Sequence, residues 1–136
     1  MSLFDATLRD VLASGYRARF MAMGDSMHPT IRSGDAVEIA PCDVSDLRRG
    51  DIVLASLARG LTLHRVVRIS PQGIVMRGDN ALREDPPFSP AELLGRVVNC
   101  EEITHDAGPF DGLVKIIRTG RRFVCGLRYH FQAFSG

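Results

Sequence analysis

The chain has 136 residues, a formal net charge of +1, 45% hydrophobic residues and 24% charged residues. This length fits a single folded domain. The balance of apolar and charged residues excludes a disordered or low-complexity chain. The small net charge gives no indication of nucleic-acid binding, so we expect no nucleic-acid partner.

Residues 3–14 carry apolar side chains at helical spacing, with Ser2 as a candidate N-cap and Gly15 as a C-terminal stop. Short runs rich in Val, Ile and Leu follow, separated by Gly, Pro, Asp and Asn, and these runs predict strands. No helical pattern alternates with them, so we predict a mostly β, antiparallel fold rather than a parallel sheet. The predicted strands cover residues 19–23, 36–40, 51–57, 61–69, 73–77 and 94–98.

The C-terminal segment, residues 113–136, has a different charge pattern. All 16 acidic residues of the chain precede it, and its only charged residues are lysine and arginine. Its apolar residues share one side of a helical wheel, while Gly120 and Gly126 each destabilise a helix by about 1 kcal/mol. We therefore expect a broken, amphipathic basic tail that packs on the sheet. Peripheral contact with an anionic membrane surface through residues 113–136 and a partner-protein interface are the alternatives.

These patterns predict one domain over residues 1–136, with a helical segment at 1–18, a β core at 19–104 and the basic tail at 105–136. The N-terminus has charged residues within its apolar stretch, unlike a signal peptide. No window approaches the roughly 18 apolar residues of a membrane span. The three cysteines, Cys42, Cys100 and Cys125, lack metal or disulfide spacing, which favours free thiols in a reducing compartment. We expect a cytoplasmic protein without a metal or organic cofactor.

Ser26 is a candidate nucleophile. It follows a predicted strand and lies between Gly24 and Pro29, which favour a tight, partly fixed loop. A serine hydroxyl is weak alone and needs a neighbouring base. The chain has one lysine, Lys115, in the basic tail, where desolvation that would lower its pKa is not expected.

Four histidines remain as candidate bases: His28, His64, His105 and His130. His64 lies within a predicted strand, which can hold an imidazole rigidly, and imidazole suits a general base at neutral pH. The alternative is a structural, hydrogen-bonding histidine. An acid that orients the ring could be Asp79 or Asp85, although Asp79 could equally cap a turn.

Several short motifs within about residues 20–98 resemble the conserved motifs of the signal peptidase superfamily, which includes the LexA-like autoproteases. They follow one another in the same order as in that superfamily. They are the nucleophile box Ser26-Met27-His28-Pro29-Thr30, the Gly34-Asp35 strand, the Arg49-Gly50-Asp51-Ile52-Val53 box, His64-Arg65-Val66-Val67, Gly78-Asp79-Asn80 with Asp85, and Gly95-Arg96-Val97.

His64 stands where bacterial signal peptidases and LexA-like proteins have lysine, which is similar to the Ser-His-Asp signal peptidases of archaea and the endoplasmic reticulum. The resemblance implies Ser26 as nucleophile, His64 as general base, and Asp85 or Asp79 as the orienting acid. It also implies that Gly24 replaces a residue that usually helps to bind the oxyanion, which leaves this role mainly to the Ser26 N–H. We expect the His64 ring to approach the Ser26 hydroxyl to about 2.6–3.2 Å and a carboxylate to contact its other nitrogen.

The function that this resemblance implies is a serine endopeptidase that acts on a peptide or precursor protein, with small residues before the cut. No membrane anchor is expected from the sequence. The alternatives are an inactive peptide-binding or regulatory module and a LexA-like self-cleaving regulator. A GDSL-type lipid esterase is disfavoured because its alternating α/β pattern is missing.

Overall fold

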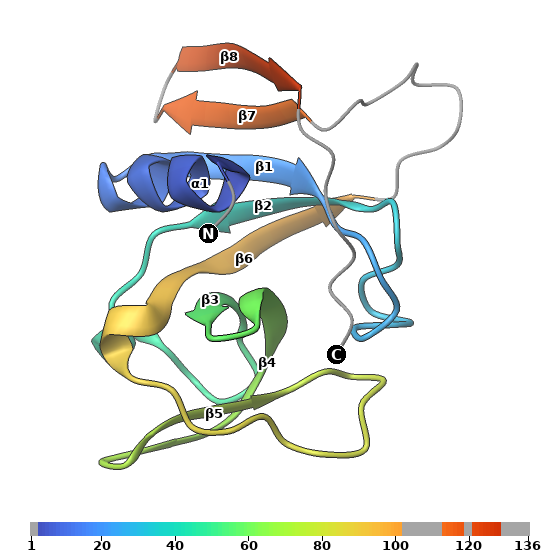
Figure 1. The fold of residues 1–136 in the computed structure, drawn as a ribbon, viewed down its shortest axis with the longest axis vertical. Coiled ribbons are helices and arrows are strands. Elements are labelled where there is room, and N and C mark those ends of the chain that lie inside the picture. The colour runs from blue at the N-terminus through green and yellow to red at the C-terminus, as the bar shows by residue number, and fades with distance from the viewer. Residues whose placement is uncertain (1–2, 102–112, 119–120, 129–136) are drawn as a thin grey trace.

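The computed structural model describes residues 3–101, 113–118 and 121–128, which form an N-terminal helix and one antiparallel sheet. The sheet has eight strands in the order β5-β4-β3-β6-β2-β1-β7-β8 (Figure 1). The elements are α1 (Leu3–Ala13), β1 (Arg17–Met21), β2 (Ala36–Ala40), β3 (Ile52–Leu57), β4 (Gly60–Ser70), β5 (Gly73–Arg77), β6 (Leu93–Glu101), β7 (Leu113–Arg118) and β8 (Arg121–Arg128), with short 3-10 helices at Val44–Asp46 and Pro90–Glu92.

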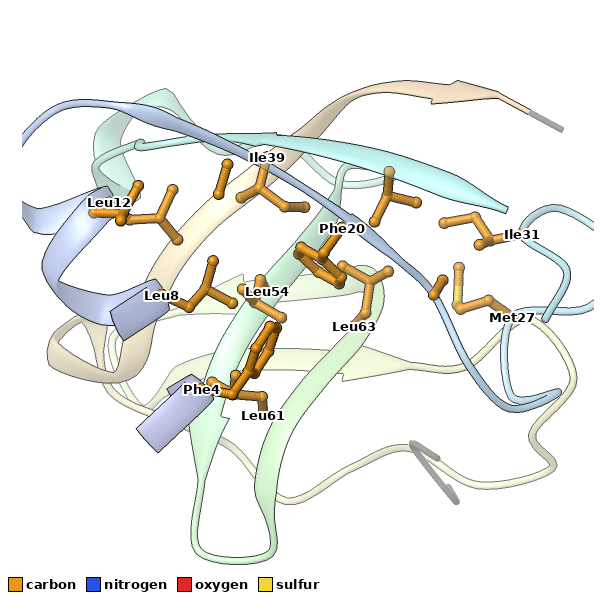
Figure 2. Packing of buried hydrophobic residues seen from close by; sticks show 14 residues of the cluster. Phe4, Leu8, Leu12, Phe20, Met27, Ile31, Ile39, Leu54, Leu61 and Leu63 are labelled. Carbon is orange, nitrogen blue, oxygen red and sulfur yellow. The ribbon is translucent and has the colours of Figure 1, made fainter. Parts of the chain in front are cut away.

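Helix α1 packs against the sheet through its apolar stripe. Phe4, Leu8 and Leu12 are buried with residues of several strands in one core cluster (Figure 2). The Phe4 ring meets Phe20 of β1 edge to face, with ring centroids 6.1 Å apart. Leu54 of β3 belongs to the same cluster, so the helix packs against both β1 and β3.

A second core cluster lies on the other face of the β3-β4-β5 region. It contains Val53, Val66 and Met76 together with Leu47, Ala55, Ile74 and Phe88. Side chains alternate along a strand. Leu63 of β4 therefore points to the first cluster, and Val66 points to the second. His64 lies two residues before Val66 on the same strand, so its ring lies on the face of the second cluster.

The mostly β, antiparallel prediction is confirmed, and the helix and the first six strands have nearly the predicted bounds. The helix predicted at 3–14 is α1, and the strand predicted at 94–98 extends further as β6. The division into segments 1–18, 19–104 and 105–136 stays a prediction. Among the residues described, no helix is both long and apolar enough to span a membrane.

The expected broken helix in the tail is wrong. Residues of this segment form β7 and β8, an antiparallel pair in which β7 also pairs with β1. Val114, Ile116 and Ile117 are β-branched and favour strands, and the exposed edge of β1 offers backbone partners that an isolated helix does not need. The rest of the tail lies outside the described residues, and its membrane contact stays a prediction.

Candidate active site

Ser26 lies in the loop between β1 and β2, and both ends of this loop are fixed. The Ala22 N–H donates to the Asp35 carbonyl at 2.8 Å, and the Gly34 N–H donates to the Ala22 carbonyl at 2.7 Å. Met27, the next residue after Ser26, is buried in the first core cluster. The buried methionine anchors the loop while Ser26 itself stays partly accessible.

The His64 ring is joined to Asp85. Its Nδ1 lies 2.5 Å from the Asp85 Oδ2, and the two side chains are 1% and 8% exposed. A carboxylate only accepts hydrogen bonds, so Nδ1 carries the proton in this pair. A charge-assisted hydrogen bond of this kind fixes the tautomer and leaves Nε2 as the ring's basic atom.

Gly78 lets the histidine ring and the serine loop approach each other. A Cβ atom added to Gly78 would lie 2.5 Å from the Ser26 carbonyl oxygen and 3.0 Å from the His64 Nε2. Asn80 then holds the loop, because its backbone N–H donates to the Ser26 carbonyl at 2.9 Å and its side chain donates to the Asp25 carbonyl at 3.1 Å. His64 and Ser26 therefore flank the same glycine from two elements.

The expected hydrogen bond between Ser26 and His64 is not formed. The buried Nε2 has no hydrogen-bond partner within the described part of the chain. Catalytic hydrogen bonds are often long or misaligned without substrate, because the nucleophile's rotamer is then free to change. Buried polar atoms normally have a hydrogen-bond partner. Nε2, which lies on the side of the serine loop, is therefore suited to bind a hydroxyl or another donor there.

Asp79 is engaged elsewhere. Arg65 donates to both of its carboxylate oxygens at 2.8 Å, and the Thr30 hydroxyl donates to Oδ2 at 2.5 Å. The hydrogen bonds from Arg65, aided by Thr30, hold the pKa of Asp79 below its ordinary value, although partial burial opposes this shift. Of the two acids that the sequence left open, Asp85 contacts His64, and Asp79 ties the serine loop to β4.

Arg59 is a neighbour of the site that the sequence analysis missed. It lies in the two-residue turn between β3 and β4, where Leu57 pairs with Gly60. Its Nη2 donates to the Asp85 Oδ1 at 2.6 Å, and its Nε donates to the Thr62 hydroxyl at 3.3 Å. Both carboxylate oxygens of Asp85 are therefore bonded. An arginine at a hairpin turn is usually solvated, so the sequence gave little reason to expect Arg59 at the site.

The remaining histidines, the single lysine and Cys42 are either away from this site or outside the described residues. His28 is exposed in the serine loop. His105 and His130 lie outside the described residues, and Lys115 belongs to β7. Burial raises the pKa of the Cys42 thiol to about 11, so this cysteine is protonated at neutral pH and is a poor nucleophile. Among the residues described, no group of histidine, cysteine and acidic side chains has the arrangement of a metal site.

A histidine held by a buried carboxylate beside a serine loop is an arrangement typical of serine hydrolases. The comparison with protein families gives the same class, because the model of the Peptidase S24-like family matches residues 8–98. The chain belongs to this family, within the LexA and signal peptidase-like serine peptidase superfamily. Searches among curated proteins and among solved structures found no match.

Proposed function

We propose that the protein is a serine endopeptidase that hydrolyses a peptide bond in a precursor or leader peptide through an acyl-enzyme. Ser26 is the nucleophile, His64 the general base and Asp85 the orienting acid. The observation that carries this proposal is the buried His64–Asp85 pair, whose free Nε2 adjoins the serine loop across Gly78. The family supports the class of enzyme.

In the proposed reaction, the Ser26 hydroxyl oxygen attacks the scissile carbonyl carbon while Nε2 of His64 takes the hydroxyl proton. The imidazolium that forms is stabilised by the ionised Asp85 at Nδ1. His64 then returns the proton to the leaving amine, which departs and leaves an ester on Ser26. A water molecule, deprotonated by the same nitrogen, hydrolyses this ester and restores the hydroxyl.

The oxyanion of the tetrahedral intermediate needs hydrogen-bond donors. The Ser26 backbone N–H has no acceptor among the hydrogen bonds of residues 3–101, and so is available for this role. Gly24 has no side chain to offer, and its own N–H donates to the Ser33 hydroxyl at 3.3 Å. We assign the oxyanion mainly to the Ser26 N–H, where loss of a single donor typically costs about 10²–10³ in rate.

A fluorophosphonate probe tests this proposal, because it reacts covalently with an activated serine. The wild-type chain is expected to gain one adduct at pH 8, and Ser26→Ala is expected to gain none. Ser45→Ala is a matched control, since Ser45 is exposed in the 3-10 helix Val44–Asp46, and it should be labelled like the wild type. Circular dichroism establishes that each variant is folded.

The labelling experiment and a second measurement, of intact mass, distinguish the alternatives. A folded wild-type chain that gains no adduct at pH 8 favours the inactive peptide-binding module. A LexA-like self-cleaving regulator would lose intact mass during prolonged alkaline incubation, and it would lose it at the same rate at different protein concentrations. Our proposal predicts that the intact mass persists and that peptide cleavage occurs in trans.

A further inference from the structure

A strongly basic surface cavity is lined by residues of β4 and β5 and by the segments that precede β3 and follow β5. It has a volume of about 670 Å³, and its lining includes Arg48, Arg49, Arg68 and Arg77, with Glu84 as its one acidic residue. Ile69, which is 40% exposed, contributes apolar surface. Four guanidinium groups around one hollow create a local positive potential that the net charge of the chain does not reveal.

The cations of this cavity are only partly neutralised. Arg68 forms an ion pair with Glu84 at 3.2 Å, and both side chains are about half exposed. Within the described part of the chain, the guanidinium groups of Arg48 and Arg49 have no hydrogen-bond or ion-pair partner. Arg77 forms no direct ion pair there, but it lies close enough to Asp79 to lower the pKa of that carboxyl. Arg48 and Arg49 are therefore available to an anionic group from outside, and Arg77 is only partly neutralised by Asp79.

The cavity adjoins the proposed catalytic residues in two places along the chain. Arg77 directly precedes Gly78, the glycine between the Ser26 carbonyl and the His64 ring, and Glu84 directly precedes Asp85. The Asp85 N–H donates to the Met76 carbonyl at 2.8 Å, so these two chain segments lie side by side. Arg77 pairs with Arg65 across the sheet, and Arg65 binds Asp79, which accepts a hydrogen bond from Thr30 of the serine loop. The cavity and the serine loop therefore lie on connected segments of the fold.

We propose that this arginine-lined cavity binds acidic side chains of the peptide substrate, a few residues from the bond that is cut. The assignment rests on the proposed peptidase function and adds a substrate class to it: peptides with aspartate or glutamate at this distance. Guanidinium groups bind carboxylates bidentately and at fixed geometry. Partial exposure keeps each contact modest, so selectivity comes from several arginines acting together.

A peptide fits this surface better than a nucleic acid. Nucleic-acid surfaces combine a long basic stripe with aromatic side chains that stack on bases. Here the cations surround a single hollow, and the lining contains no aromatic residue. A compact cluster of arginines of this size matches one or a few carboxylates of a peptide better than a long phosphate backbone.

Binding can be measured without catalysis, by fluorescence anisotropy of a labelled hexaglutamate peptide with the full-length Ser26→Ala variant. Hexaglutamate is expected to bind, hexaglutamine to bind at least tenfold more weakly, and added salt to weaken the hexaglutamate complex. The double variant Arg49→Gln/Arg77→Gln should bind hexaglutamate about tenfold more weakly. The matched control is Arg17→Gln/Arg19→Gln, which removes the same charge from β1, a strand remote from β4 and β5 in the sheet, and should stay within about twofold of the parent.

Equal loss of binding in the two double variants, or no preference for hexaglutamate, would overturn the proposal. A twelve-base-pair duplex or an anionic phosphatidylserine vesicle that binds more tightly, and depends on Arg49 and Arg77, would overturn it in favour of a nucleic acid or a membrane. Because Ser26→Ala is used throughout, these results are independent of whether the fluorophosphonate experiment supports the peptidase.

Discussion

The Nδ1 of His64 and the Oδ2 of Asp85 lie 2.5 Å apart, although 21 positions separate these residues in the chain. The pair is buried between β4 and the segment that follows β5, and Arg59 occupies the second oxygen of the carboxylate. Burial of both partners means that water cannot replace either of them at low cost. Their contact therefore fixes the direction in which Nε2 faces.

Substitution of the two candidate acids separates their roles. Asp85→Asn is expected to lower the rate of fluorophosphonate labelling by about 10³–10⁴, because an amide no longer stabilises the imidazolium or selects its tautomer. Asp79→Asn leaves the His64–Asp85 pair intact and is expected to lower this rate by less than about tenfold. Labelling rates of the two folded variants at pH 8 give the comparison. An equal loss in both would refute the assignment of the orienting role to Asp85.

Arg59 is expected to act through Asp85 as a positioning residue. Arg59→Gln frees one carboxylate oxygen and should slow labelling by about tenfold, a loss consistent with one charge-assisted hydrogen bond. Arg59→Lys should recover part of the rate. Since the effect passes through Asp85, Arg59→Gln should cause almost no further loss in the Asp85→Asn background. Fully additive losses in this double-mutant cycle would show that Arg59 acts independently of the carboxylate.

Gly78 should be irreplaceable for a steric reason. In Gly78→Ala the new methyl group would meet the Ser26 carbonyl and the His64 ring, so the serine loop must shift away from the base. We expect a stability loss of about 1–3 kcal/mol and almost complete loss of labelling. Gly95→Ala is the control, because its methyl group would lie equally close to the Ala40 carbonyl but remote from Ser26. A folded Gly95→Ala protein that loses labelling to the same extent would contradict this explanation.

Asp79 should make stability depend on pH. Arg65 and Thr30 hold its pKa in the folded protein below the ordinary value of 3.8. The ionised carboxylate therefore stabilises the folded protein above about pH 4, and this contribution is lost as the pH falls through the lowered pKa. At pH 7, Asp79→Asn is expected to unfold with a free energy about 1 kcal/mol lower than the wild type.

Urea unfolding of both proteins at several pH values measures this difference in free energy. The gap between wild type and Asp79→Asn should narrow as the pH falls below about 4, because protonation removes the ion pair from the wild type as well. A gap that stays constant down to pH 2.5 would show that the Arg65 pair contributes nothing to stability.

The sequence predicted the β core well, because its strands are short β-branched runs with clear punctuation by glycine, proline and aspartate. It failed for the C-terminal segment. There, apolar residues from β7 and β8 happened to fall on one side of a helical wheel. Periodicity within one segment cannot show that a free strand edge, here that of β1, is available for pairing.

The geometry of the candidate site was predictable in part. The sequence analysis chose Ser26 and His64 as residue types with suitable neighbours, and the family resemblance added their order in the chain; their catalytic roles stay a prediction. The choice between Asp79 and Asp85 depended on which carboxylate returns to the buried face of β4, and this is a property of tertiary structure. Arg59 was missed for the same reason, since nothing in the local sequence relates a turn arginine to a carboxylate 26 residues later.

The dependence of Ser26 reactivity on His64 tests the proposed mechanism most directly. Wild type and His64→Gln should be reacted with the fluorophosphonate at pH 8, and the adduct should be located by peptide mass mapping. We expect an adduct on Ser26 in the wild type and a labelling rate at least about 10³-fold lower in folded His64→Gln. An adduct on another residue, or equal labelling of Ser26 in both proteins, would contradict the mechanism.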